Sequence, residues 1–419
     1  MIEAAKGTRD ILPGEIARWQ LVEARAREVF SLFGFREIRT PIFEPTELFA
    51  RGVGEGTDIV AKEMYTFPDR KGRSLTLRPE NTAPVARAYI EHSMHRGSDI
   101  ERLYYIGPMF RYERPQKGRT RQFHQIGVEA LGSEHPCVDA ETLHMLVIFL
   151  GRLDIRPVEL QISSVGCSDC RPAYRDLLVR ELAPHRDRLC ADCHRRLEIN
   201  PLRCLDCKVP ADRAIVEKVS PILDHLCSSC RAHLDAVRRY LGRLGVSHVL
   251  APRLVRGIDY YRRTTFEVSL PGLGAQSALL GGGRYDGLVQ SLGGPATPGF
   301  GFAVGEDRLV LSLPEGLAGA VERPDVFVAL VGESAIEPAL VSAARLRSAG
   351  RSVVLDPYPD RSLKAQMRRA HDLQARYVLL LGGDEVAHGT VTVKRMSDGT
   401  QRTVPEARIL DALSEATHG

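Results

Sequence analysis

The sequence predicts a mixed α/β protein of the α+β type. A first part that contains an antiparallel strand pair carries a helical insertion, and a small mixed α/β domain follows it. Three observations indicate this fold class. Strand-like segments flank a basic turn between Phe110 and Gln122, a charged stretch from Val158 to Val246 holds eight of the nine cysteines, and strands alternate with helices after Pro324. A chain of 419 residues is long enough for two or three domains.

The composition is that of an ordinary globular protein, with 43% hydrophobic and 26% charged residues. The net charge of +4 neither requires nor excludes a nucleic-acid partner, so any such binding must come from local basic patches. The sequence has no apolar run long enough to cross a membrane, and its first residues lack the apolar centre of a signal peptide. We therefore expect a cytoplasmic protein with no membrane association.

The first part begins with an amphipathic helix. After Pro13, apolar residues recur at helical spacing as far as Gly34, which marks the end of the helix. The segment Phe35–Pro45 then alternates apolar and polar residues, and Pro41 within it favours an edge strand or an interface. A Gly-rich turn, Gly52–Gly56, follows.

A carboxylate stands at the end of the next predicted strand. The strand Ser74–Leu77 leads to Arg78 and Glu80, and Thr82 begins a helix. Glu80 is in a position to bind the amine of a ligand. It is equally well explained as an acid that the helix dipole favours, so both interpretations remain open.

The stretch Phe110–Gly132 is the most informative part of the chain. It predicts two antiparallel strands joined by a loop with turn residues at 115–118. Arginine forks on a loop that can close suit a polyphosphate, although a solvated basic hairpin is the alternative. The basic residues, set against the single acid Glu113 and followed by Phe123, His124 and Gln125, are Arg111, Arg114, Lys117, Arg119 and Arg121.

The cysteines form four CxxC pairs within the predicted insertion. The two-residue spacing lets both thiolates of a pair reach one tetrahedral ion, so the pairs could form two sites of four thiolates. We expect structural Zn²⁺ that supports the fold of the insertion away from the chemistry; small reduced thiols that merely pack are the alternative. The eight residues are Cys167, Cys170, Cys190, Cys193, Cys204, Cys207, Cys227 and Cys230.

Strand-like sequence resumes after the insertion. Leu254–Ser269 predicts a turn and a strand, Gly281–Gly283 a glycine-rich turn, and Gly299–Leu309 a strand of small residues that leads into a helix. The charged and aromatic residues that these segments present are Arg256, Tyr260, Tyr261, Arg284, Tyr285, Asp286 and Arg308.

The last domain alternates strands and helices and closes with a hairpin that turns at Asp398 and Gly399. Arg361, Lys364 and Arg368 make a small basic face on its second helix. Such a face is usually only solvated, and RNA contact is the other interpretation.

Several of these segments resemble one family. Phe110–Glu113 resembles the second signature motif of class II aminoacyl-tRNA synthetases, Phe35–Phe43 the first, and Gly299–Leu309 the third. Leu254–Tyr261 and Gly282–Gly287 are similar to two peptides peculiar to histidyl-tRNA synthetases. The likeness extends from the start of the chain to its last helix.

Two residues depart from the family pattern. Asn81 stands where the family more often has Gly, and Asp307 stands before Arg308 where Glu is usual. Asn tolerates a left-handed backbone and Asp keeps the charge, so neither departure weakens the resemblance.

The resemblance implies a catalytic domain over residues 1–323, built on a six-stranded antiparallel sheet flanked by helices. A Cys-rich helical insertion at 167–246 interrupts it, and an anticodon-binding domain follows at 324–419. It implies a homodimer joined through the first motif. It also implies the ATP- and Mg²⁺-dependent attachment of L-histidine to tRNA(His) through a histidyl-adenylate.

The same resemblance implies roles for individual residues. Arg111 and Arg256 are expected to be catalytic. The expected histidine-binding residues are Glu80, Asn81, Thr82, Arg111, Gln125, Glu129, Arg256, Tyr260, Tyr261 and Tyr285. The expected ATP-binding residues are Arg111, Glu113, Arg119, Phe123 and Arg308. The expected tRNA-binding residues are Arg114, Gln116, Lys117, Arg361, Lys364 and Arg368.

A rival interpretation is a non-catalytic regulatory paralogue of the same fold that acts with ATP phosphoribosyltransferase. Such a paralogue lacks the C-terminal anticodon domain and has eroded motif arginines. This chain keeps Arg111, Arg256 and Arg308 and continues well beyond Pro324. A bare RNA-binding module would leave the polar pocket residues unexplained.

Overall fold

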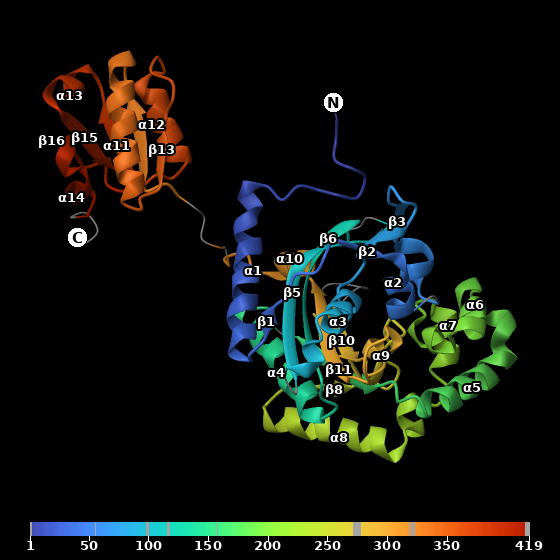
Figure 1. Ribbon diagram of the computed structural model, residues 1–419. Helices are drawn as coiled ribbons and strands as arrows, with labels where there is room; N and C mark the ends of the chain where they lie inside the picture. The colour runs from blue at the N-terminus through green and yellow to red at the C-terminus, as the bar shows by residue number, and fades with distance from the viewer. Residues whose placement is uncertain are drawn as a thin grey trace. The chain divides into compact units, whose positions relative to one another are not determined.

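The computed structural model describes residues 2–54, 56–97, 100–114, 118–156, 158–270, 278–317, 319 and 323–414. The chain divides into two compact units, Met1–Gly319 and Ala320–Gly419 (Figure 1). Among the described residues, no helix combines the length and apolar character needed to cross a membrane.

A sheet of eight strands in the order β1-β5-β6-β11-β10-β9-β7-β8 forms the centre of the first unit. The six inner strands pair antiparallel, as the fold class requires, while β1 and β8 add short parallel pairs at the edges. The strands are β1 (Arg36–Glu37), β5 (Glu101–Phe110), β6 (Gln122–Leu131), β7 (Glu159–Ser164), β8 (Val249–Leu250), β9 (Arg262–Ser269), β10 (Ala278–Arg284) and β11 (Gly299–Gly305).

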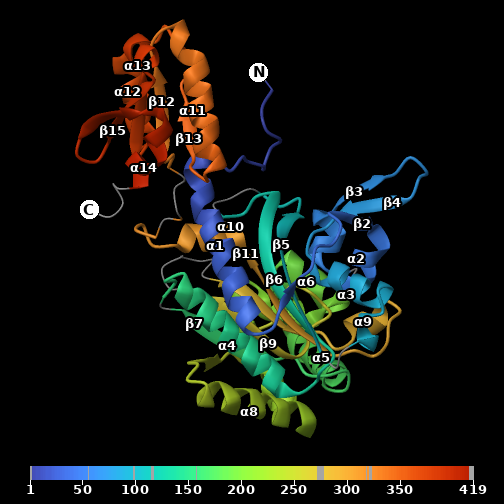
Figure 2. The ribbon, with the colours of Figure 1, turned by 60° about the vertical axis from the view of Figure 1, so that its left-hand side comes forward.

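Helices bury one face of this sheet. In Figure 2, α1 and α4 run side by side over it. Alternate strand residues such as Ile126, Val128 and Phe300 point into this layer and are fully buried, because side chains one residue apart face opposite sides of a strand. The covering helices are α1 (Pro13–Leu32), α4 (Pro136–Arg152), α8 (Ser228–Arg243) and α10 (Glu306–Ser312).

The opposite face carries a smaller apolar layer and the polar residues discussed below. Tyr105 and Met109 of β5 pack there against α3 and α9. A three-stranded sheet in the order β2-β4-β3 lies in the same unit. The elements are α2 (Thr46–Val53), a π-helix (Ile59–Glu63), α3 (Thr82–Glu91), α9 (Leu288–Ser291), β2 (Phe43–Pro45), β3 (Tyr65–Pro68) and β4 (Ser74–Leu77).

Of two local predictions from the sequence, one is confirmed in part and the other is wrong. Phe35–Pro45 does form edge strands, but they are two short ones, β1 and β2, at the edges of different sheets, with Pro41 between them. Gly281–Gly283 is not a turn but the interior of β10, paired with strands on both sides. The glycines there leave room for neighbouring atoms.

The segment between β7 and β8 folds as a helical body with its own apolar core, which includes several of the cysteines. Its helices α5, α6 and α7 lie together at one side of the unit, and α8 runs along the sheet (Figure 1). The first three are α5 (Cys170–Leu182), α6 (Ala191–Ile199) and α7 (Pro210–Val216), with 3₁₀ turns at Ala183–Arg188, Pro201–Asp206 and Ile222–His225.

The second unit is a mixed five-stranded sheet in the order β13-β12-β14-β15-β16, parallel at β13, β12 and β14 and antiparallel beyond. The hairpin turns at Gly399, whose φ of 74° requires the left-handed region. The elements are β12 (Val326–Leu330), α11 (Ile336–Ser348), β13 (Val353–Leu355), α12 (Leu363–Asp372), β14 (Tyr377–Leu381), α13 (Gly383–His388), β15 (Thr390–Arg395), β16 (Gln401–Pro405) and α14 (Ile409–Ser414).

Candidate active site

A polar cavity of about 200 Å³ lies on the sheet face opposite α1 and α4. The loop before β9, the start of α3 and strands β6, β10 and β11 supply its walls. Nine of the residues predicted to bind histidine line it. They are Glu80, Thr82, Arg111, Gln125, Glu129, Arg256, Tyr260, Tyr261 and Tyr285.

Glu129 is the central carboxylate of the cavity. Its Oε1 accepts a hydrogen bond from Thr82 Oγ1 at 2.7 Å and its Oε2 one from Tyr285 Oη at 2.5 Å. Burial raises the pKa of Glu129 to about 8, even though both hydrogen bonds favour the ionised form. Burial therefore opposes ionisation of this carboxyl more strongly than its two donors favour it.

Glu80 binds the start of helix α3. Its two carboxylate oxygens accept hydrogen bonds from the backbone N–H groups of Thr82 and Ala83, at 2.8 and 3.0 Å. Burial nevertheless raises its pKa. Glu80 thus stabilises the start of α3, as one of the two interpretations expected, and the same side chain also faces the cavity.

Two arginines bring positive charge to the cavity from opposite sides. The Nε of Arg111 donates to Pro79 O at 2.8 Å, and its guanidinium lies over the Phe123 ring, 5.4 Å from the centroid. Arg256 donates to the Glu267 carboxylate. A Cβ on Gly281 would lie 2.5 Å from the Arg256 guanidinium, so glycine at this position leaves room for the side chain to cross β10.

Two further arginines lie next to strands that line the cavity, since Arg119 precedes β6 and Arg308 follows β11. Arg119 pairs with Glu113, with 3.4 Å between Nη1 and Oε2, and both side chains are partly exposed. Arg308, on α10, donates to Ala278 O, and burial lowers the pKa of its guanidinium. The residues predicted to bind ATP therefore lie around the strand pair β5–β6 and at the start of α10.

Asn81 does not line the cavity. Its amide oxygen accepts from Thr40 Oγ1 at 2.6 Å and from Arg78 at 3.3 Å, so the side chain joins a structural network beneath β5. Its φ of −122° lies outside the left-handed region, and the tolerance of Asn for that region is not used here. Its buried Nδ2 has no hydrogen-bond partner among the described residues, and the place of Asn81 in the histidine-binding set stays a prediction.

The residues predicted to bind tRNA lie in two places. Gln116 and Lys117 fall outside the described residues. In the second unit, Lys364 and Arg368 are exposed on α12, while Arg361 pairs with Asp356 at 2.8 Å. The predicted basic face is therefore smaller than expected, because Arg361, which precedes α12, has a buried partner in Asp356.

The cysteines converge in two clusters, each with four candidate ligand atoms within 4.8 Å of one another. The first consists of Cys167, Cys170, Cys227 and Cys230. The pKa of Cys227 is lowered to about 7, chiefly because its sulfur accepts the backbone N–H of Cys230. A thiolate at neutral pH is the form that binds zinc.

The second cluster differs from the prediction. It contains Cys190, Cys193, Cys207 and the fully buried Asp212, whereas the sulfur of Cys204 donates to Cys193 O at 3.7 Å and stands outside the group. Asp212 accepts from the Cys190 backbone N–H at 3.1 Å and from the Cys207 thiol at 3.2 Å. The sequence signalled the cysteines by their spacing, but a single acid in a charged segment carries no such signal.

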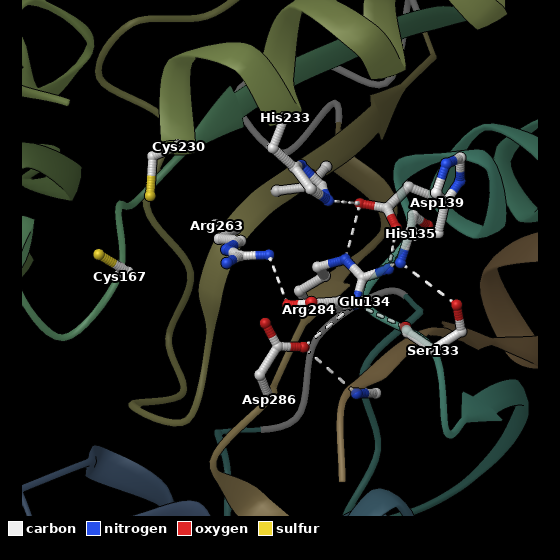
Figure 3. A network of polar contacts seen from close by, with 12 residues as sticks. Ser133, Glu134, His135, Asp139, Cys167, Cys230, His233, Arg263, Arg284 and Asp286 are labelled. Carbon is white, nitrogen blue, oxygen red and sulfur yellow. Dashed lines mark hydrogen bonds and ion pairs between the residues drawn. The ribbon is translucent and has the colours of Figure 1, made fainter. Parts of the chain in front are cut away.

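A buried ion-pair network fixes the backbone beside Tyr285. Arg284 is fully buried and pairs with Asp139 at 2.6 Å and with Asp286 at 3.1 Å (Figure 3). Burial raises the pKa of Asp139 to about 6, and the adjacent guanidinium opposes that rise. Arg284 also donates to the carbonyl oxygens of Ser133 and His135, so β10 is tied to the start of α4 just before Tyr285 enters the cavity.

The fold and the site together define a class of protein. An antiparallel sheet with a basic strand pair, a strand-to-helix unit that carries Arg308, and a polar cavity between them make up the catalytic core of a class II aminoacyl-tRNA synthetase. A solved structure, the apo histidyl-tRNA synthetase of S. aureus, is similar to this chain with a TM-score of 0.83 and 37% identity, over 99% of this chain and all of that chain (100%).

The sequence comparisons identify the family. A model of histidyl-tRNA synthetase matches residues 7–181 and 194–309, and a model of an anticodon-binding domain matches residues 325–416. The chain belongs to the histidyl-tRNA synthetase family. It is 51% identical over 417 residues to the histidine–tRNA ligase of Pelotomaculum thermopropionicum, covering 99% of this chain and 98% of that protein. It is 54% identical over 400 residues to the histidine–tRNA ligase of Pelobacter propionicus, covering 96% of each.

Proposed function

We propose that this protein is a histidine–tRNA ligase, which attaches L-histidine to tRNA(His) in two steps at the β6–β11 cavity. The observation that carries the proposal is the convergence of Glu129, Arg111 and Arg256 on one small polar cavity in a chain of this family. The relatives named histidine–tRNA ligase match it over nearly their whole length.

The first step forms the adenylate. A histidine carboxylate oxygen attacks the α-phosphorus of ATP, and the bond to the β-phosphate oxygen breaks, so pyrophosphate leaves. Arg111 and Arg256 stabilise the charge that spreads over the phosphoryl oxygens, and Arg308 holds the γ-phosphate. Phe123 stacks on adenine, and Glu113 accepts from its amino group. Arg119 neutralises the outgoing phosphates, whose charge a bound Mg²⁺ would also offset.

The second step transfers histidine. A hydroxyl of the terminal tRNA ribose attacks the carbonyl carbon of the adenylate, and AMP leaves with the phosphate oxygen that held the acyl group. The attacking ribose hydroxyl must lose its proton in this step. Phosphate oxygens of the adenylate can accept it, so the mechanism does not require a side-chain base.

Histidine selection depends on buried polar partners. Glu80, Thr82 and Gln125 bind the α-amino group, while Glu129 and Tyr261 reach the imidazole and Tyr260 and Tyr285 close the pocket around it. The buried Gln125 Oε1 has no partner among the described residues, which supports a ligand donor at this point. Leaving such groups unpaired rejects a wrong amino acid by roughly 10⁴ to 10⁵, so an editing domain is unnecessary.

The remaining parts of the proposal concern partners and location. The residues after 324 bind the anticodon, with Lys364 and Arg368 as phosphate contacts, and Arg114, Gln116 and Lys117 meet the acceptor end of the tRNA. The protein acts as a cytoplasmic homodimer, and a light-scattering mass at twice the chain mass would support that state. Zinc occupies the two clusters of the insertion.

Histidine-dependent exchange of pyrophosphate into ATP tests the proposal directly. Exchange should require histidine and Mg²⁺, and other amino acids should not replace histidine. Charging of total tRNA should then be confined to tRNA(His). Folded protein that binds ATP but gives no exchange would contradict the proposal.

A solved chain described as an ATP phosphoribosyltransferase regulatory subunit/histidyl-tRNA synthetase from Bacillus halodurans shares the fold at 22% identity, but no observation favours the regulatory alternative here.

A further inference from the structure

We propose that Arg171, in the insertion, is a positioning residue for the histidine pocket, because it holds the backbone turn that carries Tyr260 and Tyr261. This inference rests on the proposed function. It gives the insertion a direct part in the choice of amino acid, beyond support of its own fold.

The contact is between a side chain of α5 and two backbone carbonyls. Nη1 of Arg171 donates to Asp259 O at 3.2 Å and to Tyr261 O at 3.1 Å. These carbonyls flank Tyr260, so the two hydrogen bonds span the turn from one side to the other. Tyr260 and Tyr261 meet edge to face, with ring centroids 4.8 Å apart, and both line the cavity.

A second arginine, Arg262, binds the same turn. Nη1 of Arg262 donates to the same two carbonyls, at 3.2 Å to Asp259 O and 3.0 Å to Tyr261 O. Two guanidinium groups so close repel one another, and burial together with the neighbouring Arg262 lowers the pKa of Arg171 to about 10. In the part of the chain that the structure describes, no carboxylate forms an ion pair with Arg171. The coulombic attraction of the Asp259 carboxylate, which belongs to the same turn, favours the charge of Arg171.

Arg171 is itself fixed by the first cysteine cluster. It is the second residue of α5, next to Cys170, and its backbone N–H donates to Cys167 O at 3.1 Å. The sulfurs of Cys167 and Cys170 lie 3.7 Å apart. The cluster therefore sets the position of the first turn of α5, from which the guanidinium extends.

A separate backbone link joins the same two regions. Arg263 N donates to Gly166 O, and Val165 N donates to Arg263 O, both at 2.8 Å, immediately before Cys167. Arg263 has a φ of 51°, which is unusual for a residue with a side chain, so the backbone at this link is strained. In the view of Figure 3, Arg263 lies between the labelled cysteines and the Arg284 network.

Apolar packing also connects the insertion to the histidine pocket. Tyr261 is buried and belongs to the apolar core of the insertion, together with Cys170, rather than to the core of the main sheet. The ring thus touches the insertion on one side and the cavity on the other. A displacement of α5 would therefore disturb the histidine pocket more than the residues near β5 and β6 that are predicted to bind ATP.

The test is Arg171→Met, which keeps an unbranched apolar stem and removes both hydrogen bonds. Pyrophosphate exchange should show a KM for histidine raised roughly fivefold to tenfold, the size expected when hydrogen bonds from a charged group are lost. The KM for ATP should stay within about twofold. Arg171→Lys, which can still reach one carbonyl, should fall between. Arg175→Met is the matched control, because Arg175 lies on the same helix, is exposed and donates to Glu198 O, away from the Tyr260 turn.

Several outcomes would overturn the inference. Equal rises in both KM values, or a fall in kcat alone, would make Arg171 a general stabiliser of the fold, and an unchanged histidine KM would remove its role. If Arg171→Met does not fold, Arg171→Lys decides by the same ratio of KM values. Absence of histidine-dependent exchange in the unaltered protein would instead contradict the proposed function, so the two failures are distinguishable.

Discussion

Single residues in this protein show how burial decides the state of a charge. Glu129 and Glu306 are both buried carboxyls, but Glu129 has two hydrogen-bond donors and Glu306 has none among the described residues. The first faces the cavity, and the second lies where α10 packs on α1. A partnered acid can serve a ligand, whereas an unpartnered one only costs stability.

The catalytic role proposed for Arg256 makes a kinetic prediction. Arg256→Ala should slow adenylate formation about a hundredfold, the loss typical of removing one preorganised electrostatic group, while histidine and ATP still bind. Single-turnover measurement of adenylate formation checks this. Glu267→Gln keeps the guanidinium and should slow the step much less. A rate for Arg256→Ala within a few fold of the unaltered protein would remove it from the chemistry.

Glu306 makes a prediction about stability and pH. Burial raises its pKa from 4.5 to about 9, so the folded protein keeps the proton that the unfolded chain releases above about 4.5. The stability cost is absent at low pH and grows as pH rises, by at most roughly 1.4 kcal/mol per pH unit. Glu306→Gln should therefore raise the melting temperature more at pH 8 than at pH 5.

The control for this prediction is Glu315→Gln, because Glu315 is exposed. Its melting temperature should differ little from that of the unaltered protein at either pH. A gain for Glu306→Gln that is the same at both pH values would mean that the carboxyl is ionised in the folded state throughout.

At the scale of elements, strands β10 and β11 make the cavity possible because they are rich in glycine. A Cβ on Gly301 would lie 2.2 Å from Glu129 Oε2, and one on Gly281 would meet Arg256. The pocket occupies the space that side chains would otherwise fill on this face of the sheet. The insertion is stabilised in another way, because the cysteine clusters join its short helices.

The two cysteine clusters predict two metal ions with different ligands. Elemental analysis of protein purified without chelator should find about two zinc ions per chain at four ligands per ion. Cys227→Ser and Asp212→Ala should each lose one ion, whereas Cys204→Ser should keep both. Loss of an ion in Cys204→Ser but not in Asp212→Ala would show that the second site has four thiolates. Metal-free protein should lose order in the insertion first, because ligand binding there contributes to folding.

On the scale of the whole molecule, the protein consists of two compact units, one with the cavity and one with an exposed basic helix face. A division of this kind predicts that amino-acid activation and tRNA binding can be damaged separately. Chemistry that needs only small substrates depends on the first unit, and recognition of a large RNA depends on both.

Lys364→Ala combined with Arg368→Ala should therefore weaken aminoacylation and leave pyrophosphate exchange unchanged. The loss should shrink as salt is raised, because phosphate contacts act through counterion release. Arg376→Ala is the control, since that arginine is also exposed in the second unit but lies near Asp325, at 3.5 Å. Equal effects on both reactions would mean that α12 stabilises the fold and does not contact RNA.

The sequence by itself determined the long elements and the chemical types of the site residues. Helix periodicity, as after Pro13, and strand alternation, as in β5, are local properties of the chain. The motifs around Arg111 and Arg308 carry their chemistry in neighbouring residues, so they could be predicted without a fold. The same holds for the CxxC spacing.

Only the tertiary structure decided which partners meet across long distances in sequence. It paired Asn81 with Thr40, put Asp212 in place of Cys204, turned Gly281–Gly283 from a predicted turn into a strand, and brought Arg171 to the Tyr260 turn. Each of these results depends on the space around a residue and on the charged groups next to it. Both are set by packing between segments that are far apart in the chain, so no local sequence pattern encodes them.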